Sequence, residues 1–390
     1  MNFSPAKRIE EVSEYYFSMK LRQIAQLNAA GRDIISLGIG GPDRPPHDEV
    51  IESLCCEARK ADNHSYQSYT GIQPLRDAMC DWYKTRYGVA VDSSKEILPL
   101  IGSKEGIMHI SMAFVNAGDA VLVPNPGYPT YSSVSRLVQA EIIPYELSEE
   151  RGWMPDFGAL ESLDAVKGGR VKLMWVNYPN MPTGANATKE LYQKLVDFAQ
   201  RNSIVVVCDN PYSQVLNPTP MSILEIEGAK ECCIELNSLS KSLNMAGWRV
   251  GMLATNATFV EWILRVKSNV DSGMFKPLQL AAVEALKLGD EWYKELNEVY
   301  ASRRKVAAKI MQRLGCAYDE NQVGLFLWGK VADGVESGEA LCDRALDEAR
   351  VFITPGFIFG SKGARYIRIS LCATEQKMEE ALERIDKAMI

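Results

Sequence analysis

The middle of the chain alternates between two patterns of apolar and polar residues. Short runs rich in apolar and β-branched residues precede longer segments in which apolar residues recur every three or four positions, the spacing of an amphipathic helix. The clearest strand-like runs are ILPLIG (97–102), AVLVPN (120–125), VKLMWVNYP (171–179) and IVVVCDN (204–210). Strands that are apolar on both faces and joined by helices indicate a parallel sheet covered by helices. The pattern predicts an α/β fold with a large, mostly parallel, doubly wound sheet that binds ligands at the carboxyl ends of its strands.

The C-terminal part follows a different pattern. A long helical region at 291–314 precedes short strand-like runs at 323–331, 349–354 and 364–371, and a final helix. This order predicts a smaller α+β domain, against which we expect the N-terminal arm to pack. A length of 390 residues fits such a division. We expect residues 1–45 to form the arm and part of the small domain, 46–290 the large domain and 291–390 the small C-terminal domain.

The composition narrows the classes of partner. Apolar residues make up 46% of the chain and charged residues 24%, and the net charge is −7. These values are typical of a soluble globular protein, and the negative charge disfavours binding to nucleic acid or to an anionic membrane surface. The N-terminus lacks the apolar core of a signal peptide, and no apolar run approaches the roughly 20 residues that span a bilayer. We expect a cytoplasmic protein whose partners are small molecules and a second copy of itself.

Neither the cysteines nor the histidines form a recognisable site. The nine cysteines include two adjacent pairs but no C-x-x-C spacing, which indicates free thiols in a reducing compartment. The three histidines, His47, His64 and His109, include no H-x-x-x-H pair. We therefore expect no metal site and no catalytic cysteine–histidine pair.

The segment SLSKSLNMAGWRVG (238–251) carries the most specific candidate chemistry. It follows a strand-like run and combines Lys241 with the hydroxyls of Ser238 and Ser240 and with Arg249, whose guanidinium can fork onto a phosphate. Because a lysine amine forms an imine with an aldehyde, these groups suit a phosphorylated aldehyde cofactor that is held covalently. A surface lysine in a serine-rich turn would show the same local pattern. Whether Lys241 is a cofactor-binding lysine or a surface lysine depends on whether the rest of the chain supplies the other contacts that such a cofactor needs.

Two further strand ends carry polar groups. Ser103 and Lys104 follow the run ILPLIG and open an amphipathic helix, where backbone N–H groups, a hydroxyl and a positive charge make an anion site. The alternative is that Ser103 is only an N-cap. Asp209 closes the run IVVVC, and a buried carboxylate needs a cation such as a pyridinium nitrogen. Tyr212 would then donate to a phenolic ring oxygen, whereas the alternative is a turn-forming D-N-P cluster.

An aromatic residue and a glycine-rich loop add to the picture. Tyr128 follows the run AVLVPN and either stacks flat on a planar ring or is simply half-buried at a turn. The loop that contains Gly40 could be mistaken for a dinucleotide-binding loop. Pro42 follows at once, so no helix can begin there, and we reject that interpretation.

These motifs occur in the order found in one family of pyridoxal-phosphate (PLP) enzymes. The chain resembles the fold-type I PLP aminotransferases of class I/II, in the aspartate aminotransferase superfamily, over nearly its whole length. Details such as DIISLGIGGPD, GSK and DNPY are similar to those of LL-diaminopimelate and aspartate aminotransferases. The matching positions are Gly40, Tyr66, Ser103, Tyr128, Asn180, Asp209, Tyr212, Lys241, Arg249 and Arg368.

The resemblance implies a role for each of these residues. Lys241 is expected to bind PLP and to shuttle a proton, with Asp209 and Tyr212 as further catalytic residues. Arg368 is expected to bind the substrate α-carboxylate, and the backbone of Gly40 to close over the substrate. The other implied cofactor contacts in the same subunit are Ser103, Lys104, Tyr128, Asn180, Ser238, Ser240 and Arg249. Tyr66 is expected to reach the cofactor phosphate of a neighbouring subunit, so the resemblance also implies a homodimer.

One position departs from the family pattern. Members usually carry N-N-P-T-G where this chain has Asn180 and Met181 before Pro-Thr-Gly. The asparagine before the proline bonds the ring oxygen in those enzymes, whereas a thioether is a weak acceptor and cannot donate. Either Asn180 takes over this role or Tyr212 holds the ring oxygen without help. We favour Asn180 as a neighbour of the site.

The resemblance implies transamination from an L-amino acid to a 2-oxo acid, with 2-oxoglutarate as the expected acceptor. It favours aspartate, LL-diaminopimelate or a similar donor. A PLP-dependent C–S lyase is the alternative, because the cofactor stabilises any carbanion at Cα and the pocket chooses which bond breaks. A dicarboxylic donor needs a second cation. Arg44 and Lys276 are candidates by loop position, although solvated surface charges are the commoner explanation of such residues.

Overall fold

Seven strands form the central sheet of the computed structural model, which describes residues 1 and 3–389. Neighbouring strands are parallel except for the two antiparallel pairs that β8 makes. The order across the sheet is β2 (Ile97–Leu100), β8 (Gly251–Ala254), β7 (Cys233–Ser238), β6 (Val205–Asp209), β5 (Val171–Val176), β3 (Ala120–Asn125) and β4 (Glu141–Glu146). Asp209 pairs with Leu236 at the end of β6, so these two strands end side by side.

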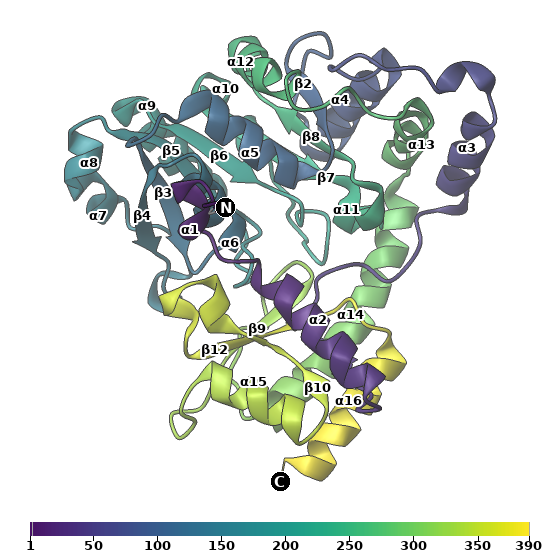
Figure 1. Cartoon of the computed structure of the whole chain (residues 1–390), viewed down its shortest axis with the longest axis vertical. Helices are drawn as coiled ribbons and strands as arrows, with labels where there is room; N and C mark the ends of the chain where they lie inside the picture. The colour runs from purple at the N-terminus through teal and green to yellow at the C-terminus, as the bar shows by residue number, and fades with distance from the viewer. Residues whose placement is uncertain (2, 390) are drawn as a thin grey trace.

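Helices cover both faces of this sheet (Figure 1). One face packs against α5 (Ser103–Phe114), α6 (Pro129–Leu137) and α12 (Ala257–Lys267). The other face packs against α4 (Gln73–Tyr87), α9 (Lys189–Asn202) and α13 (Lys276–Leu286), together with the short helices α7 (Phe157–Ser162), α8 (Asp164–Lys167) and α10 (Ala229–Cys232). The helix α3 (Asp48–Ala58) lies against α13.

Local signals in the sequence set where these helices begin and end. Thr188 caps α9, because its hydroxyl accepts a hydrogen bond from the Leu191 amide at 3.1 Å. Asn256 caps α12 in the same way through the Phe259 amide at 2.9 Å. Gly88 ends α4 with φ +67°, a left-handed conformation that costs glycine little. Capping of this kind makes the alternation of strand and helix readable from the chain alone.

The smaller domain is built on an antiparallel sheet in the order β11 (Thr354–Pro355), β12 (Tyr366–Ser370) and β9 (Phe326–Lys330). Its helices are α14 (Asp290–Arg313), α15 (Gly338–Asp347) and α16 (Glu375–Ala388). In Figure 1, α14 runs from the large domain at the top to the small domain below. Tyr293 near its start packs in the core of the large domain, and Tyr300 packs in the core of the small one. This helix therefore connects the two cores.

The N-terminal segment also reaches the small domain. After α1 (Lys7–Glu10), the helix α2 (Tyr16–Ala29) lies beside the small domain in Figure 1. The strand β1 (Ile35–Ser36) pairs in parallel with β10 (Val351–Phe352). The remaining short elements are α11 (Leu239–Ser242) and the 3-10 turns η1 (Ala61–Asn63), η2 (Glu149–Arg151), η3 (Ile223–Glu225), η4 (Ala246–Trp248), η5 (Gly356–Phe359) and η6 (Ser361–Gly363).

The predicted fold class is confirmed: a mostly parallel α/β sheet with helices on both faces is joined to a smaller α+β domain. The domain boundaries that we propose from the sequence place the last division at residue 290, where α14 begins. Across the described residues, no helix is long and apolar enough to cross a membrane.

Trp328 offers a test of the small-domain core. It is 1% exposed and stacks on Tyr366, with ring centroids 4.9 Å apart. Loss of a buried aromatic side chain costs about 3–5 kcal/mol, so we expect Trp328→Ala to reduce the free energy of unfolding of this domain by that amount, measured by urea unfolding followed by circular dichroism. Phe3→Ala, at an aromatic residue that is 90% exposed, serves as the control. Equal stability of the two variants would contradict the expected core role of Trp328.

Candidate active site

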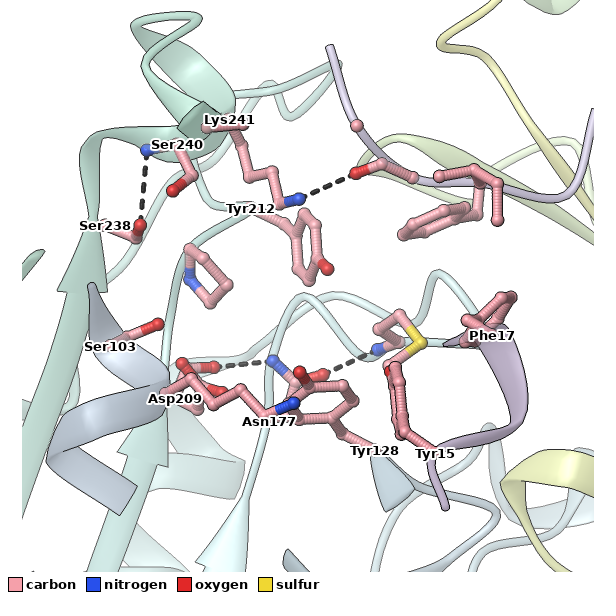
Figure 2. A pocket seen from close by; sticks show the side chains of 18 of the residues that line it. Tyr15, Phe17, Ser103, Tyr128, Asn177, Asp209, Tyr212, Ser238, Ser240 and Lys241 are labelled. Atoms are coloured by element: carbon pink, nitrogen blue, oxygen red, sulfur yellow. Dashed lines mark hydrogen bonds between the residues drawn. The ribbon is translucent and has the colours of Figure 1, made fainter. Parts of the chain in front are cut away.

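A cavity of about 320 Å³ opens at the carboxyl ends of β6 and β7, where the arm and the small domain meet the large sheet. Figure 2 shows that side chains from several elements point into it. The predicted site residues that line the cavity are Gly40, Ser103, Lys104, Tyr128, Asp209, Tyr212, Ser238, Ser240, Lys241, Arg249 and Arg368. Asn180 and Tyr66 are not among the lining residues. The cavity therefore gathers groups that lie far apart in the sequence.

Lys241 lies on α11, which begins directly after β7. The hydroxyl of Ser238 caps this short helix by accepting a hydrogen bond from the Ser240 amide at 3.2 Å. The Lys241 amine donates to the carbonyl oxygen of Gly40 at 2.6 Å and lies 6.0 Å from the centroid of the Tyr212 ring. Burial lowers the pKa of Lys241, and the positive charges of Arg368 and Arg249 lower it further. A lowered pKa increases the fraction of unprotonated amine, the nucleophilic form.

Hydroxyls, a guanidinium and a helix N-terminus surround the end of the cavity next to α5. Arg249 donates to the Ser240 hydroxyl at 3.4 Å and to the Ala246 carbonyl oxygen at 3.0 Å. Gly102 has φ +79°, and a Cβ there would lie 2.1 Å from Nη2 of Arg249. Only glycine leaves room for the guanidinium beside the first turn of α5. The exposed amides of this turn, with Ser103 and Arg249, make a site for a phosphate group.

Asp209 is buried at the end of β6, with 4% of its surface exposed. Its Oδ2 accepts a hydrogen bond from the Tyr131 hydroxyl at 2.8 Å, whereas Oδ1 has no partner among the described residues. Burial raises the pKa of Asp209 to about 6, although the Tyr131 hydrogen bond and the positive charge of Lys241 oppose this shift. A protonated ring nitrogen beside Oδ1 would satisfy that oxygen and stabilise the carboxylate. The free oxygen therefore fits a pyridinium cofactor.

Arg368, on β12, is a buried cation without an acidic partner among the described residues. It donates to the carbonyl oxygen of Gly38 at 2.8 Å and to the sulfur of Met181 at 3.1 Å. Its guanidinium carbon lies 3.9 Å from the centroid of the Phe326 ring, and no described residue accepts a hydrogen bond from its Nε. Burial lowers the pKa of Arg368 to about 10. A planar guanidinium held among aromatic rings suits a substrate carboxylate.

Asn177, rather than Asn180, faces the cavity. Asn180 is buried and donates to the carbonyl oxygen of Asn177 at 3.1 Å, while its side-chain oxygen accepts from the Thr183 hydroxyl at 2.8 Å. Asn177 donates to the backbone oxygen of Asp209 at 2.5 Å and accepts from the Met181 amide at 2.7 Å. Sequence reasoning missed Asn177. It directly follows β5, next to the end of β6, and the strand-end rule would have found it.

The N-terminal segment supplies a wall that no motif indicated. Tyr15, Phe17 and Leu21 line the cavity, and Tyr15 and Phe17 flank it in Figure 2. The Lys104 amine lies 4.4 Å from the centroid of the Tyr15 ring, and burial together with Arg249 lowers the pKa of Lys104. Tyr15 and Lys104 are about ninety positions apart, so no local sequence pattern could predict that they lie together.

Comparisons with known proteins agree with this geometry. The family model for aminotransferase class I and II matches residues 32–385. An LL-diaminopimelate aminotransferase from Nitratidesulfovibrio vulgaris is 41% identical and covers 98% of this chain and 99% of its own. The enzyme of that name from Aquifex aeolicus is 39% identical, with 98% of each chain covered. The chain belongs to the aminotransferase class I and II family.

Solved structures show the same likeness. Substrate-bound BacF from Bacillus subtilis superimposes with a TM-score of 0.93 at 33% identity, covering 99% of this chain and 98% of BacF. An aminotransferase from Staphylococcus aureus gives a TM-score of 0.88 at 28% identity, with 98% of each chain covered. The predicted family, transaminase activity and PLP cofactor are therefore confirmed. This aminotransferase is a PLP-dependent enzyme that moves an amino group from an amino acid to a 2-oxo acid.

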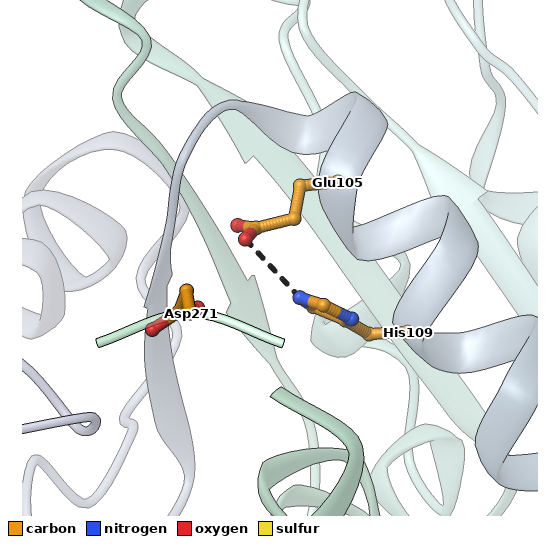
Figure 3. Close-up of side chains that lie close together, drawn as sticks. All are labelled: Glu105, His109 and Asp271. Carbon is orange, nitrogen blue, oxygen red and sulfur yellow. Dashed lines mark ion pairs between the residues drawn. The ribbon is translucent and has the colours of Figure 1, made fainter. Parts of the chain in front are cut away.

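A second cluster of ionisable side chains lies outside the cavity of this aminotransferase. Glu105 and His109 on α5 lie near Asp271, which follows α12 (Figure 3). The His109 Nε2 atom is 3.2 Å from Glu105, but Asp271 already pairs with the Lys267 amine at 2.6 Å. The positive charge of the buried Lys267 amine neutralises Asp271 and repels a divalent cation, so it disfavours metal binding by these three residues. We assign no metal to this cluster.

Gly102 gives a direct test of the anion site. We expect Gly102→Ala to weaken PLP binding by about tenfold or more, because the added Cβ displaces the Arg249 guanidinium, and tenfold corresponds to about 1.4 kcal/mol. Fluorescence titration of the cofactor-free protein with PLP measures the change. The control is Gly118→Ala, at φ +87° with no atom within 4 Å of the new Cβ. Equal loss in both variants would mean that backbone strain, not the Arg249 contact, limits binding.

Proposed function

We propose that this aminotransferase uses Lys241 as its covalent anchor for PLP and as its proton-transfer base. The supporting observation is that one cavity contains the Lys241 amine together with Asp209 and Arg368, and that neither Oδ1 of Asp209 nor Nε of Arg368 has a hydrogen-bond partner among the described residues. PLP, when bound, withdraws electrons from the substrate Cα through its protonated ring nitrogen. In this proposal the Lys241 amine serves as anchor and base, Asp209 pairs with the ring nitrogen, and Arg368 binds the substrate carboxylate.

Lys241 is the proposed base because its amine is held inside the cavity with a lowered pKa. With PLP bound, Lys241 would hold it covalently until a donor amino acid takes that place. The free amine would then accept the Cα proton on Nζ and give it back later, so a single positioned group would work first as base and then as acid. The carbonyl oxygen of Gly40, 2.6 Å from Nζ, orients the amine in the meantime.

Asp209 and Tyr212 hold the two sides of the ring in this proposal. Ionised Asp209 would keep the ring nitrogen protonated, and the hydroxyl of Tyr212 would donate to the ring oxygen. Asn177 positions Asp209 through its hydrogen bond to the Asp209 backbone oxygen. Asn180 keeps a structural role in the turn, which leaves Tyr212 as the ring-oxygen donor. Ser103, Ser238, Ser240 and Arg249 bind the phosphate, and Tyr128 stacks on the ring.

Arg368 binds the α-carboxylate of the donor through two parallel hydrogen bonds. Its partners in the free enzyme are a backbone oxygen and a thioether, both weaker acceptors than a carboxylate. A substrate carboxylate therefore forms a charge-assisted pair with Arg368, while the hydrogen bonds that it replaces, to Gly38 and Met181, are weaker. The backbone of Gly40 closes the loop over the substrate.

We infer that the active form is a homodimer in the cytoplasm. Tyr66 is 90% exposed and lies outside the cavity of its own chain, as expected of a side chain that completes a neighbouring site. Phe275 at 45% and Val270 at 62% are further exposed apolar residues of the large domain. Analytical ultracentrifugation of the wild type and of Tyr66→Phe tests whether the protein forms a dimer. A comparison of the PLP affinities of the same two proteins tests whether the Tyr66 hydroxyl contacts the cofactor of the partner subunit. The cytoplasmic assignment is supported by nine cysteines that are all free thiols.

The proposed donor carries a second carboxylate at the far end of its side chain, as LL-diaminopimelate and aspartate do, and 2-oxoglutarate is the proposed acceptor. Four cations line the cavity: Lys104, Lys241, Arg249 and Arg368. The last three already have tasks. Lys104 lies beside Tyr15 and has no ion pair with a described residue, so it is free for the distal carboxylate. Arg44 and Lys276 do not line the cavity of their own chain.

Lys241→Ala tests the catalytic assignment. We expect the variant to lose the visible absorption of covalently bound PLP and all transamination, because no other amine of the cavity occupies the position of Nζ. Absorption spectra and a coupled assay for oxo-acid formation measure both. In the wild type, pyridoxamine phosphate should accumulate with a single amino acid, whereas release of ammonia and pyruvate from cysteine conjugates would indicate a C–S lyase. Normal turnover by Lys241→Ala would refute the assignment.

Lys104→Met tests the donor. A hydrogen bond to a charged group contributes about 1.5–3 kcal/mol, so we expect the ratio of kcat/KM for LL-diaminopimelate to kcat/KM for alanine to fall by about tenfold or more. Initial-rate kinetics with 2-oxoglutarate provide the measurement. Lys276→Met is the comparison variant and should keep the wild-type ratio. If Lys276→Met changes the ratio and Lys104→Met does not, the distal carboxylate is bound by a cation of the partner subunit instead.

A further inference from the structure

Glu235 is a buried acidic residue that the reaction does not use. It lies on β7 with no surface exposed, on the face of the sheet that packs against α4 and α9. Its Oε2 accepts hydrogen bonds from the Ser222 hydroxyl at 2.9 Å and from the Ile223 amide at 3.0 Å. Its Oε1 has no hydrogen-bond partner in the part of the chain that the structure describes. Because a buried carboxyl group costs free energy, its contacts call for an explanation beyond packing.

Ser222 and Ile223 stand at the far end of the loop that carries Tyr212. This loop leaves β6 after Asp209 and returns to the sheet at η3, which begins at Ile223. At the near end, the Asn210 amide donates to the Leu236 carbonyl oxygen at 2.8 Å. The Asn210 side chain crosses the base of the loop and donates to the Met221 carbonyl oxygen at 2.9 Å. Both ends of the loop are therefore tied to neighbouring residues of one strand, Glu235 and Leu236.

We propose that Glu235 is a positioning residue that sets the location of Tyr212 by anchoring the far end of the loop 210–222 to β7. The proposal deepens the proposed function, in which Tyr212 bonds the ring oxygen. Glu235 touches neither cofactor nor substrate, since it does not line the cavity. It acts through the loop 210–222, because β7 binds both ends of this loop and so sets the distance between them.

The surroundings of Glu235 contain no compensating cation. Tyr83 and Tyr87 of α4, Tyr192 of α9, Cys208 of β6 and Cys233 of β7 face it. Asn210 also faces the carboxyl group, and no lysine or arginine forms an ion pair with it in the described part of the chain. Burial raises the pKa of Glu235 from 4.5 to about 7, against the opposing effect of the Ser222 and Ile223 hydrogen bonds.

Two substitutions separate anchoring from charge. Glu235→Gln keeps a carbonyl oxygen that can accept from Ser222 and Ile223, whereas Glu235→Leu has a similar volume and no acceptor. We expect kcat of the holoenzyme to fall by about tenfold in Glu235→Leu, with KM for the donor within about twofold, and Glu235→Gln to stay within about twofold in both. If Glu235→Leu does not fold, Glu235→Asp, which withdraws the carboxylate by one methylene, takes its place in the comparison.

A double-mutant cycle tests whether the effect passes through Tyr212. In a Tyr212→Phe background the hydroxyl is already absent, so Glu235→Leu should lower kcat by less than about twofold further. If Glu235→Leu lowers kcat by the same factor in the wild type and in Tyr212→Phe, Glu235 does not act through the Tyr212 hydroxyl, and the proposal is overturned. Loss of kcat in Glu235→Gln equal to that in Glu235→Leu would overturn it as well.

Hydrogen exchange provides a readout that does not depend on the reaction. The Val215 amide donates to the Tyr212 carbonyl oxygen at 3.0 Å inside the loop. We expect peptides that cover 211–216 to exchange faster in Glu235→Leu than in Glu235→Gln. Unchanged exchange in both variants would refute the anchoring role. If the Lys241 experiment fails while exchange changes as expected, the proposed function is wrong and the anchor stands.

The pH dependence of stability tests the ionisation of Glu235. A raised pKa in the folded protein gives a stabilising contribution that is present below pH 4.5 and is lost as the pH rises to about 7. The melting temperature of the wild type should therefore fall relative to Glu235→Gln between these pH values and run parallel above them. Glu225→Gln, on the same turn but less buried, is the control and should show a smaller trend. Parallel curves throughout would show that folding leaves the pKa of Glu235 unchanged and would contradict the expected effect of burial.

Discussion

Charged groups that are buried without counter-ions determine the design of this aminotransferase. Asp209 and Arg368 lie in one cavity with 4% and 3% of their surfaces exposed, and each has one polar atom without a partner among the described residues. An unpaired buried ion costs several kcal/mol, so both groups gain stability when they pair with an opposite charge. In the proposed function, a cationic ring nitrogen beside Asp209 and a substrate carboxylate beside Arg368 would relieve these costs.

The parallel sheet brings these groups together. Strands β5, β6 and β7 end at one edge, and Asn177, Asp209 and Ser238 stand at their ends. The first turn of α5 lies at the same edge and supplies backbone amides for an anion. The placement depends on hydrogen bonding between strands, which sets the register of β5, β6 and β7 and so brings these three residues together.

The opposite wall comes from the small domain and the N-terminal arm. Arg368 is held by β12, whereas Tyr15 and Phe17 reach the cavity from the segment at the start of α2. Because α14 packs in both cores, a change in the angle between the domains would move Arg368 relative to Lys241. In the proposed function, the small domain binds the substrate carboxylate and the large domain binds the cofactor. Their spacing is a property of the whole molecule.

The sequence by itself determined the elements and the local chemistry. Lys241 after β7, Asp209 at the end of β6 and Ser103 at the start of α5 are each marked by residues within a few positions, since strand ends, caps and turns are local. Asn180 shows the limit of this reasoning: its motif is local, but whether Asn180 or Asn177 faces the cavity depends on the path of the turn after β5. Tyr15, Phe17, Lys104 beside Tyr15 and the anchor at Glu235 were decided by the tertiary structure alone. The first three join the N-terminal segment to distant parts of the chain, and the last joins a loop to a strand within the large domain, so each depends on how separate elements pack and not on a local pattern.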